Sequence, residues 1–237
     1  MDVKKQEERI QLEKFLSNEK LKFLVSKIED SETPDFKTLI NNKSISIEHT
    51  KLIHPNLQQV EKYTDKIVLL AHEKFKQKYP DEKLYVLITF ENIIFKGGKI
   101  AEENYVNEVF EIVEKVYLKN KEYSFDIETL RHKEKESDLI ESFWISNNKN
   151  FENWQTFGAF LVDYIDINWL KSIINKKEKN LTKYKYDFEE NWLLLMSDFG
   201  TRASANRIDH IDFSKIESEF DKIYIYCYRA NEIEIIK

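Results

Sequence analysis

The segment 84–90, Leu-Tyr-Val-Leu-Ile-Thr-Phe, is a nearly continuous apolar run. Its length suits a β-strand, and apolar side chains at successive positions require that both faces of the strand be covered. Similar runs occur at 192–196 and 223–228. Helices on both faces of a sheet are the usual cover for such strands, so the sequence predicts a mixed α/β fold.

Helical spacing of apolar residues predicts helices at 8–28, 57–79, 102–117 and 168–184, with a break near Ser17-Asn18 left open in the first. Pro34 ends the first of them, because proline disfavours helical geometry in the residue before it. Two short strands, 36–40 and 44–50, are predicted to form a hairpin. We interpret the chain as one domain covering 1–237, with an insertion at roughly 120–165 that includes an aromatic cluster from Phe143 to Phe160.

The charge balance limits the choice of function. The chain has 43 acidic and 37 basic side chains, a formal net charge of -6, which argues against indiscriminate coating of DNA but leaves a local basic surface open. Cys227 is the single cysteine, so an internal disulfide and a zinc cluster are excluded. Neither a leader segment nor an apolar membrane span of about 18–20 residues is visible. We expect a cytoplasmic protein without a membrane partner.

Two acidic residues mark the hairpin. Asp35 opens its first strand and Glu48 lies inside its second, so antiparallel pairing can bring both carboxylates to the same end. Mg²⁺ and Mn²⁺ prefer such oxygen ligands, and a shared ion requires the two carboxylates to lie within about 8 Å of each other. Glu32 is a candidate third ligand, and Glu8 or Glu13 of the first helix are alternatives.

Pro34-Asp35 and Glu48-His49-Thr50, set in this order of helix, turn and strands, resemble the motif of the PD-(D/E)XK nuclease superfamily, which includes restriction and repair nucleases. The resemblance implies a restriction-endonuclease-like mixed sheet flanked by helices. It also implies hydrolysis of phosphodiester bonds with Mg²⁺ or Mn²⁺, in DNA or, as the less favoured substrate, RNA. Asp35 and Glu48 would then hold the metal ion, and Thr50 would line the site.

The resemblance departs from the family at Thr50, which stands where the family usually has a lysine and cannot supply positive charge. In some branches of the superfamily a neighbouring helix provides this lysine. Lys177 falls in the apolar stripe of the predicted helix 168–184, directly before the strand 192–196. Lys74 has a similar place in the helix 57–79. We favour Lys177 and keep Lys74 as the alternative.

The helix that contains Lys177 is locally basic and could follow a nucleic-acid backbone. The predicted contacts are Lys171, Lys176, Lys179 and Lys183. The alternative is a solvated lysine face, with Lys177 extending past its apolar neighbours.

The two histidines near the acidic pair are not candidate catalytic residues. His49 should point to the opposite face of the strand from Glu48, as a core residue, and His54 lies in a loop.

Two functions are alternatives to a nuclease. The first is a catalytically inactive member of the same fold that binds nucleic acid or another protein. The second is an α/β interaction protein in which the acidic pair arose by chance. A homodimer is left open.

Overall fold

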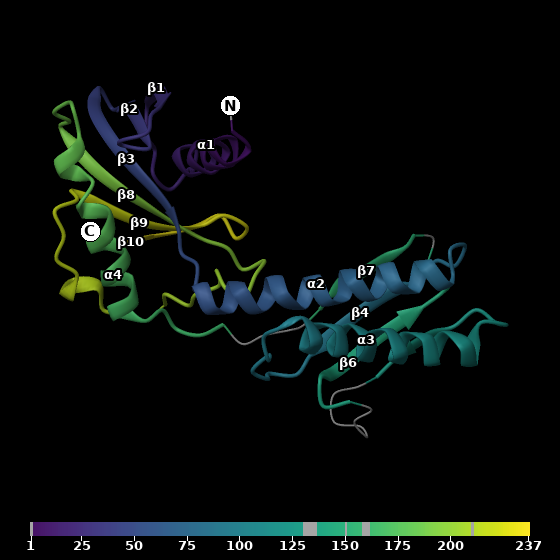
Figure 1. Cartoon of the computed structure of the whole chain (residues 1–237). Helices are drawn as coiled ribbons and strands as arrows, with labels where there is room; N and C mark the ends of the chain where they lie inside the picture. The colour runs from purple at the N-terminus through teal and green to yellow at the C-terminus, as the bar shows by residue number, and fades with distance from the viewer. Residues whose placement is uncertain (1, 130–136, 150, 158–161, 210) are drawn as a thin grey trace. The chain divides into compact units, whose positions relative to one another are not determined.

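The computed structural model describes residues 2–129, 137–149, 151–157, 162–209 and 211–237. The chain forms two compact units, one from residues 1–54 and 161–237 and the other from residues 55–160 (Figure 1). Each unit has its own sheet and its own hydrophobic core. The mixed α/β class is therefore confirmed. Within the described ranges, no helix has the length and apolar character needed to cross a membrane.

The first unit contains a six-stranded sheet in the order β1-β2-β3-β8-β9-β10. Its strands are β1 (Val25–Asp30), β2 (Phe36–Ile40), β3 (Lys43–Lys51), β8 (Glu190–Ser197), β9 (Lys222–Cys227) and β10 (Glu232–Ile235). The first three form an antiparallel meander, as the predicted hairpin requires. Strands β3, β8 and β9 are parallel, so the sheet is mixed.

Two helices cover the two faces of this sheet. Alternate residues of β8 supply both cores: Trp192 and Leu194 pack with α1 (Val3–Leu16), whereas Leu193 and Leu195 pack with α4 (Ile167–Glu178). Because both faces of β8 are buried, its sequence is continuously apolar. The Asp166 carboxylate begins α4 by accepting hydrogen bonds from the backbone N–H groups of Asn168 and Trp169.

Two predicted helices differ from the observed elements. The helix expected over 8–28 ends at Leu16, and residues Val25–Asp30 form β1. This strand is mostly exposed and its register shifts between Val25 and Lys27, so it lacks the alternating pattern that identifies a strand. The helix expected over 168–184 ends at Glu178 and is followed by a short 3₁₀ turn, Leu181–Lys183.

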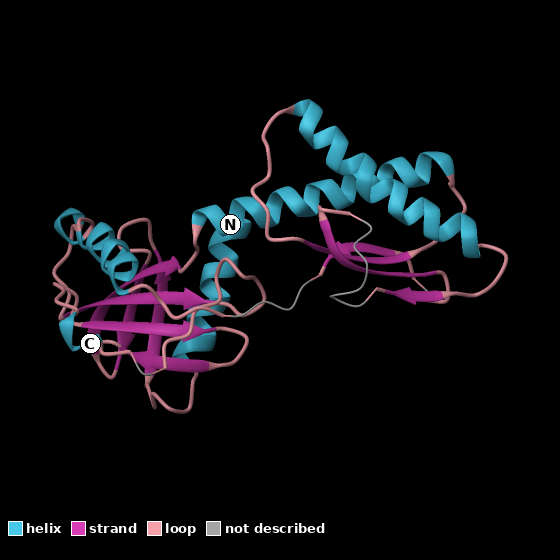
Figure 2. Ribbon diagram, turned by 90° about the horizontal axis from the view of Figure 1, so that it is seen from below, coloured by secondary structure: helices cyan, strands magenta, loops and turns pink. Residues whose placement is uncertain are grey.

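The second unit contains a four-stranded sheet in the order β5-β6-β4-β7. Its elements are α2 (Pro55–Lys78), β4 (Tyr85–Phe90), α3 (Lys99–Asn120), β5 (Asp126–Glu128), β6 (Ile140–Ser146) and β7 (Asn153–Thr156). Both helices lie on the same side of the sheet (Figure 2). Their buried side chains, including Phe75 and Val113, form one core with Val86 and Ile88 of β4.

The insertion expected at 120–165 covers only the last three strands of the second unit, which begins at Pro55. The strand predicted at 84–90 pairs with β6 and β7, because apolar periodicity identifies a strand but not its partners. In the aromatic cluster Phe143 is buried and Phe151 and Phe157 are exposed, while Phe160 lies outside the described residues.

Burial of tyrosine makes the first unit sensitive to alkali. Burial raises the pKa of Tyr224 from 10.0 to about 12, with a further contribution from Glu190. The protonated phenol therefore stabilises the fold fully below pH 10, and this contribution of about 2–3 kcal/mol is lost as the pH rises towards 12. We expect Tyr224→Phe to unfold less steeply with pH than the wild type between pH 10 and 12. Thermal midpoints measured across this range test the difference, and identical slopes would contradict it.

Candidate functional site

The acidic pair lies at one end of the β2–β3 hairpin, on the face of the sheet that α4 covers. Phe36 pairs with Ile47, so the residues next to them, Asp35 and Glu48, stand side by side. Glu48 lies opposite Leu193 of β8, whose side chain packs in the α4 core. The Glu48 side chain is 2% exposed and that of Asp35 is 22% exposed. Two carboxylates thus meet at the edge of an apolar layer.

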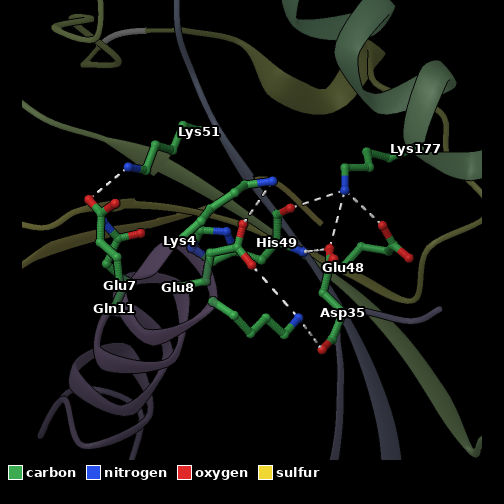
Figure 3. Close-up of polar contacts among 10 residues, drawn as sticks. Lys4, Glu7, Glu8, Gln11, Asp35, Glu48, His49, Lys51 and Lys177 are labelled. Atoms are coloured by element: carbon green, nitrogen blue, oxygen red, sulfur yellow. Dashed lines mark hydrogen bonds and ion pairs between the residues drawn. The ribbon is translucent and has the colours of Figure 1, made fainter. Parts of the chain in front are cut away.

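Lys177 of α4 reaches both carboxylates. Its ammonium donates to Glu48 Oε2 at 2.8 Å, to Asp35 Oδ2 at 3.2 Å and to the His49 backbone carbonyl at 3.0 Å (Figure 3). Because one nitrogen contacts both carboxylates, they lie within the distance that a shared ion requires. The structure therefore brings together Asp35, Glu48 and Lys177.

Other groups hold the carboxylates in place. Glu48 accepts hydrogen bonds from Tyr184 Oη at 3.1 Å and from Asn180 Nδ2 at 3.3 Å. Asp35 Oδ2 accepts the backbone N–H of His49 at 2.8 Å. Lys5 of α1 donates to the Asp35 backbone carbonyl at 2.8 Å. Each carboxylate therefore keeps at least one hydrogen-bond donor that is independent of Lys177.

The site changes the pKa of its lysine and its tyrosine. Burial lowers the pKa of Lys177, but the charges of Asp35 and Glu48 and their hydrogen bonds outweigh burial, so the net pKa is raised. Burial, together with the negative charge of Glu48, raises the pKa of the Tyr184 phenol. Both groups therefore carry their protons at neutral pH, and each donates to Glu48.

His49 lies on the opposite face of β3, where the strand alternation predicted it. Its ring is buried against the edge of Phe36, and its Nε2 has no hydrogen-bond partner within the part of the chain that the structure describes. Burial lowers the pKa of His49 to about 3. The neutral imidazole is thus a core residue, and only its backbone carbonyl and N–H serve the site.

The remaining acidic candidates make other contacts. Glu32 is exposed on the bend before Pro34. Glu8 is buried on α1 and forms ion pairs with Lys4 at 3.5 Å and Lys5 at 3.7 Å. Glu13 forms an ion pair with Arg9. In the structure, Glu8 and Glu13 thus neutralise helix cations.

Three further candidates also have defined places. Thr50 is half-buried near the end of β3. His54 stacks on Trp169 with 3.8 Å between the ring centroids. Lys74 belongs to the second unit, where its ammonium donates to Asn107 at 2.6 Å and lies over the Phe110 ring.

The predicted basic surface follows α4 and the turn after it. Lys176, Lys179 and Lys183 are exposed and Lys171 is half-buried. A hollow of about 480 Å³ opens on the sheet face that carries the acidic pair. Lys37 lines it two residues from Asp35, and its ammonium lies 4.2 Å from the centroid of the Tyr186 ring, which is 62% exposed.

Asn180 and the polar role of Tyr184 were not predicted from the sequence. Lys177, Asn180 and Tyr184 recur at three- and four-residue spacing, so they share one face even though regular helix ends at Glu178. This polar stripe, which follows the apolar stripe of the helix, was the sequence signal that could have identified Asn180 and Tyr184.

The donor set fits a hard divalent cation. Two carboxylate oxygens and the His49 carbonyl converge on the point where the Lys177 ammonium lies. Mg²⁺ is commonly held by one or two carboxylates, with water and substrate phosphate completing its ligands. Among the described residues, no three His, Cys, Asp or Glu side chains gather as a metal-binding group, so the third protein ligand here would be the carbonyl.

Comparisons of the chain with protein-family models, with curated proteins and with solved structures found no match. The functional assignment therefore depends on the geometry of the site.

Proposed function

We propose that the first unit is a metal-dependent nuclease of the PD-(D/E)XK type that hydrolyses phosphodiester bonds in DNA. The observation that carries the proposal is the convergence of Asp35, Glu48 and Lys177 at one end of the β2–β3 hairpin. An acid directly before β2 and an acid on β3, joined by a lysine from a helix, are the elements that the resemblance requires once Thr50 replaces the usual lysine.

The order of elements in the first unit supports this proposal. The helix α1 precedes the antiparallel meander β1-β2-β3, and α4 precedes β8, which pairs in parallel with the strand that carries Glu48. In the PD-(D/E)XK superfamily, too, a core helix directly precedes the next core strand. Lys177 comes from that helix, three residues before Asn180.

In the proposed mechanism Asp35, Glu48 and the His49 carbonyl would hold Mg²⁺ or Mn²⁺. The bound ion would lower the pKa of a water molecule and offset negative charge on the scissile phosphate. Lys177 supplies a second positive charge beside the reacting group. Tyr184 and Asn180 act as positioning residues, because they fix the Glu48 carboxylate without occupying the position where the three oxygens converge.

The surroundings suit an extended nucleic acid. The exposed lysines of α4 can neutralise phosphates near the site. In the adjacent hollow Lys27 and Lys37 are balanced by Glu29 and Asp187, so its exposed Tyr186 ring is better suited to stacking on a base than to binding phosphate. We place this activity in the cytoplasm, in accord with the single buried thiol of Cys227.

The direct test is cleavage of DNA by the purified full-length protein. Supercoiled plasmid, linear duplex, single-stranded DNA and RNA are incubated with Mg²⁺, with Mn²⁺ and with EDTA. We expect nicked or linear products from DNA with either ion and none with EDTA, because the carboxylates alone cannot activate water. Absence of cleavage with both ions, or equal cleavage with EDTA, would contradict the proposal.

A second candidate function is an inactive nucleic-acid-binding module of the same fold. The observation that favours it is Lys177 itself, whose ammonium already neutralises the carboxylates that would hold a metal ion. DNA binding in EDTA that added Mn²⁺ does not change, together with no cleavage, would support this candidate over the nuclease.

A further inference from the structure

The position of the Lys177 ammonium has a consequence for metal binding. Its nitrogen lies within 2.8–3.2 Å of Glu48 Oε2, the His49 carbonyl and Asp35 Oδ2, which are the oxygens that a divalent ion would use. An ammonium donates three hydrogen bonds, so these three acceptors match its full capacity. These three oxygens can therefore bind either the Lys177 ammonium or a divalent metal ion, but the two cations cannot occupy the same position together.

We propose that Lys177 acts as a tethered cation that competes with the divalent metal ion for these three oxygens. This inference rests on the metal site of the proposed function, and it adds that Lys177 opposes binding of the metal ion there. The ion would bind when the ammonium leaves, and the displaced ammonium would then supply positive charge beside the scissile phosphate. Lys177 therefore alternates between closing the site and serving the reaction.

The structure allows this exchange, because the carboxylates do not depend on Lys177 for their positions. Glu48 remains bonded to Tyr184 and Asn180, and Asp35 remains bonded to the His49 N–H. The Lys177 side chain is 21% exposed, so its ammonium has a route to solvent. Departure of the ammonium leaves a preformed pair of negative charges.

The competition gives Lys177 opposite effects on binding and on turnover. Removing the ammonium leaves two carboxylates without their counter-ion, and a unit charge at this distance changes cation affinity by roughly tenfold or more in a partly solvated site. The same substitution removes the positive charge beside the phosphate. Removal of a lysine that lies away from these oxygens would not strengthen metal binding.

The test is titration of the full-length protein with Mn²⁺ alone, followed by calorimetry and by the electron paramagnetic resonance signal of the free ion. We expect Lys177→Met to bind Mn²⁺ about tenfold more tightly than the wild type. Lys177→Gln should behave in the same way, whereas Lys177→Arg keeps the charge and should not gain affinity. Lys215→Met, which removes an exposed lysine of the same unit, is the matched control and should leave affinity unchanged.

Thermal unfolding gives a second measurement. Mn²⁺ should raise the melting temperature of Lys177→Met more than that of the wild type, because the ion replaces the missing positive charge. Lys177→Gln provides the same comparison if the methionine variant fails to fold. A folded Lys177 variant without charge that binds Mn²⁺ no more tightly than the wild type would overturn the competition.

Failure of this inference can be separated from failure of the proposed function by assaying DNA cleavage on the same samples. A wild type that cleaves DNA, with no gain of affinity in Lys177→Met, overturns the competition alone. A gain of affinity without any cleavage by the wild type supports the competition and overturns the nuclease assignment. No Mn²⁺ binding by any variant overturns both.

Discussion

Asp35→Asn is expected to reduce metal-dependent DNA cleavage roughly a hundred- to a thousandfold, the scale seen when a direct electrostatic contact at a reacting centre is lost. The amide keeps the size of the side chain, and its oxygen can still accept the His49 N–H. It removes one of the two negative charges that would hold the ion. The change therefore acts on the chemistry of the site with little effect on the fold.

Single-turnover cleavage at saturating Mn²⁺ measures this loss, and far-UV circular dichroism checks the fold. Asp209→Asn is the matched control, because Asp209 is an exposed acid of the same unit that pairs with Arg207. The control should cleave DNA at the wild-type rate. Cleavage by Asp35→Asn within tenfold of the wild type would place the metal site elsewhere.

Trp192→Ala is expected to lower the free energy of unfolding of the first unit by about 3–5 kcal/mol, as for other large buried aromatic residues. Trp192 is 2% exposed and packs against Phe23 and Tyr224, with ring centroids 5.2 and 5.5 Å away. Its indole N–H also donates to Glu190 at 2.7 Å. Its removal leaves a cavity beneath α1 and takes one hydrogen-bond donor from Glu190, which keeps its ion pair with Lys43.

Urea denaturation followed by circular dichroism measures this loss, since fluorescence would change with the tryptophan itself. The control is Trp144→Ala in the second unit, where the indole is half-buried and lies beside Tyr85. We expect a much smaller loss there, confined to the second unit because the two cores share no described residue. Equal losses for the two variants would contradict this account of the cores.

Sequence reasoning worked best where a local rule sufficed. The hairpin 36–50 followed from strand alternation, and the placement of Glu48 and His49 on opposite faces followed from the period of two. Lys177 was singled out because Thr50 stands in the place of the family's lysine and Lys177 falls in the apolar stripe of the helix before the strand 192–196. The structure pairs it with the two acids. The chemical role of these three residues remains a prediction that the cleavage assay tests.

Sequence reasoning failed where pairing between distant segments decides the structure. No local pattern shows that β4 pairs with β6 and β7, so the second unit was not recognised as extending from Pro55. The edge strand β1 was taken for helix because its register is irregular and its side chains are mostly exposed. The contact of the Tyr184 hydroxyl with Glu48 likewise joins segments far apart in the chain and was not predicted.

The site joins residues from two distant segments of the chain. Lys177 is 129 residues from Glu48 and 142 from Asp35, and the whole second unit lies between them in the chain. During translation the acidic pair leaves the ribosome long before α4 is made, and the segment 55–160, whose core consists of its own residues, is synthesised in between. A growing polypeptide therefore carries the two acids without their lysine, and the complete trio exists only after synthesis has passed residue 177.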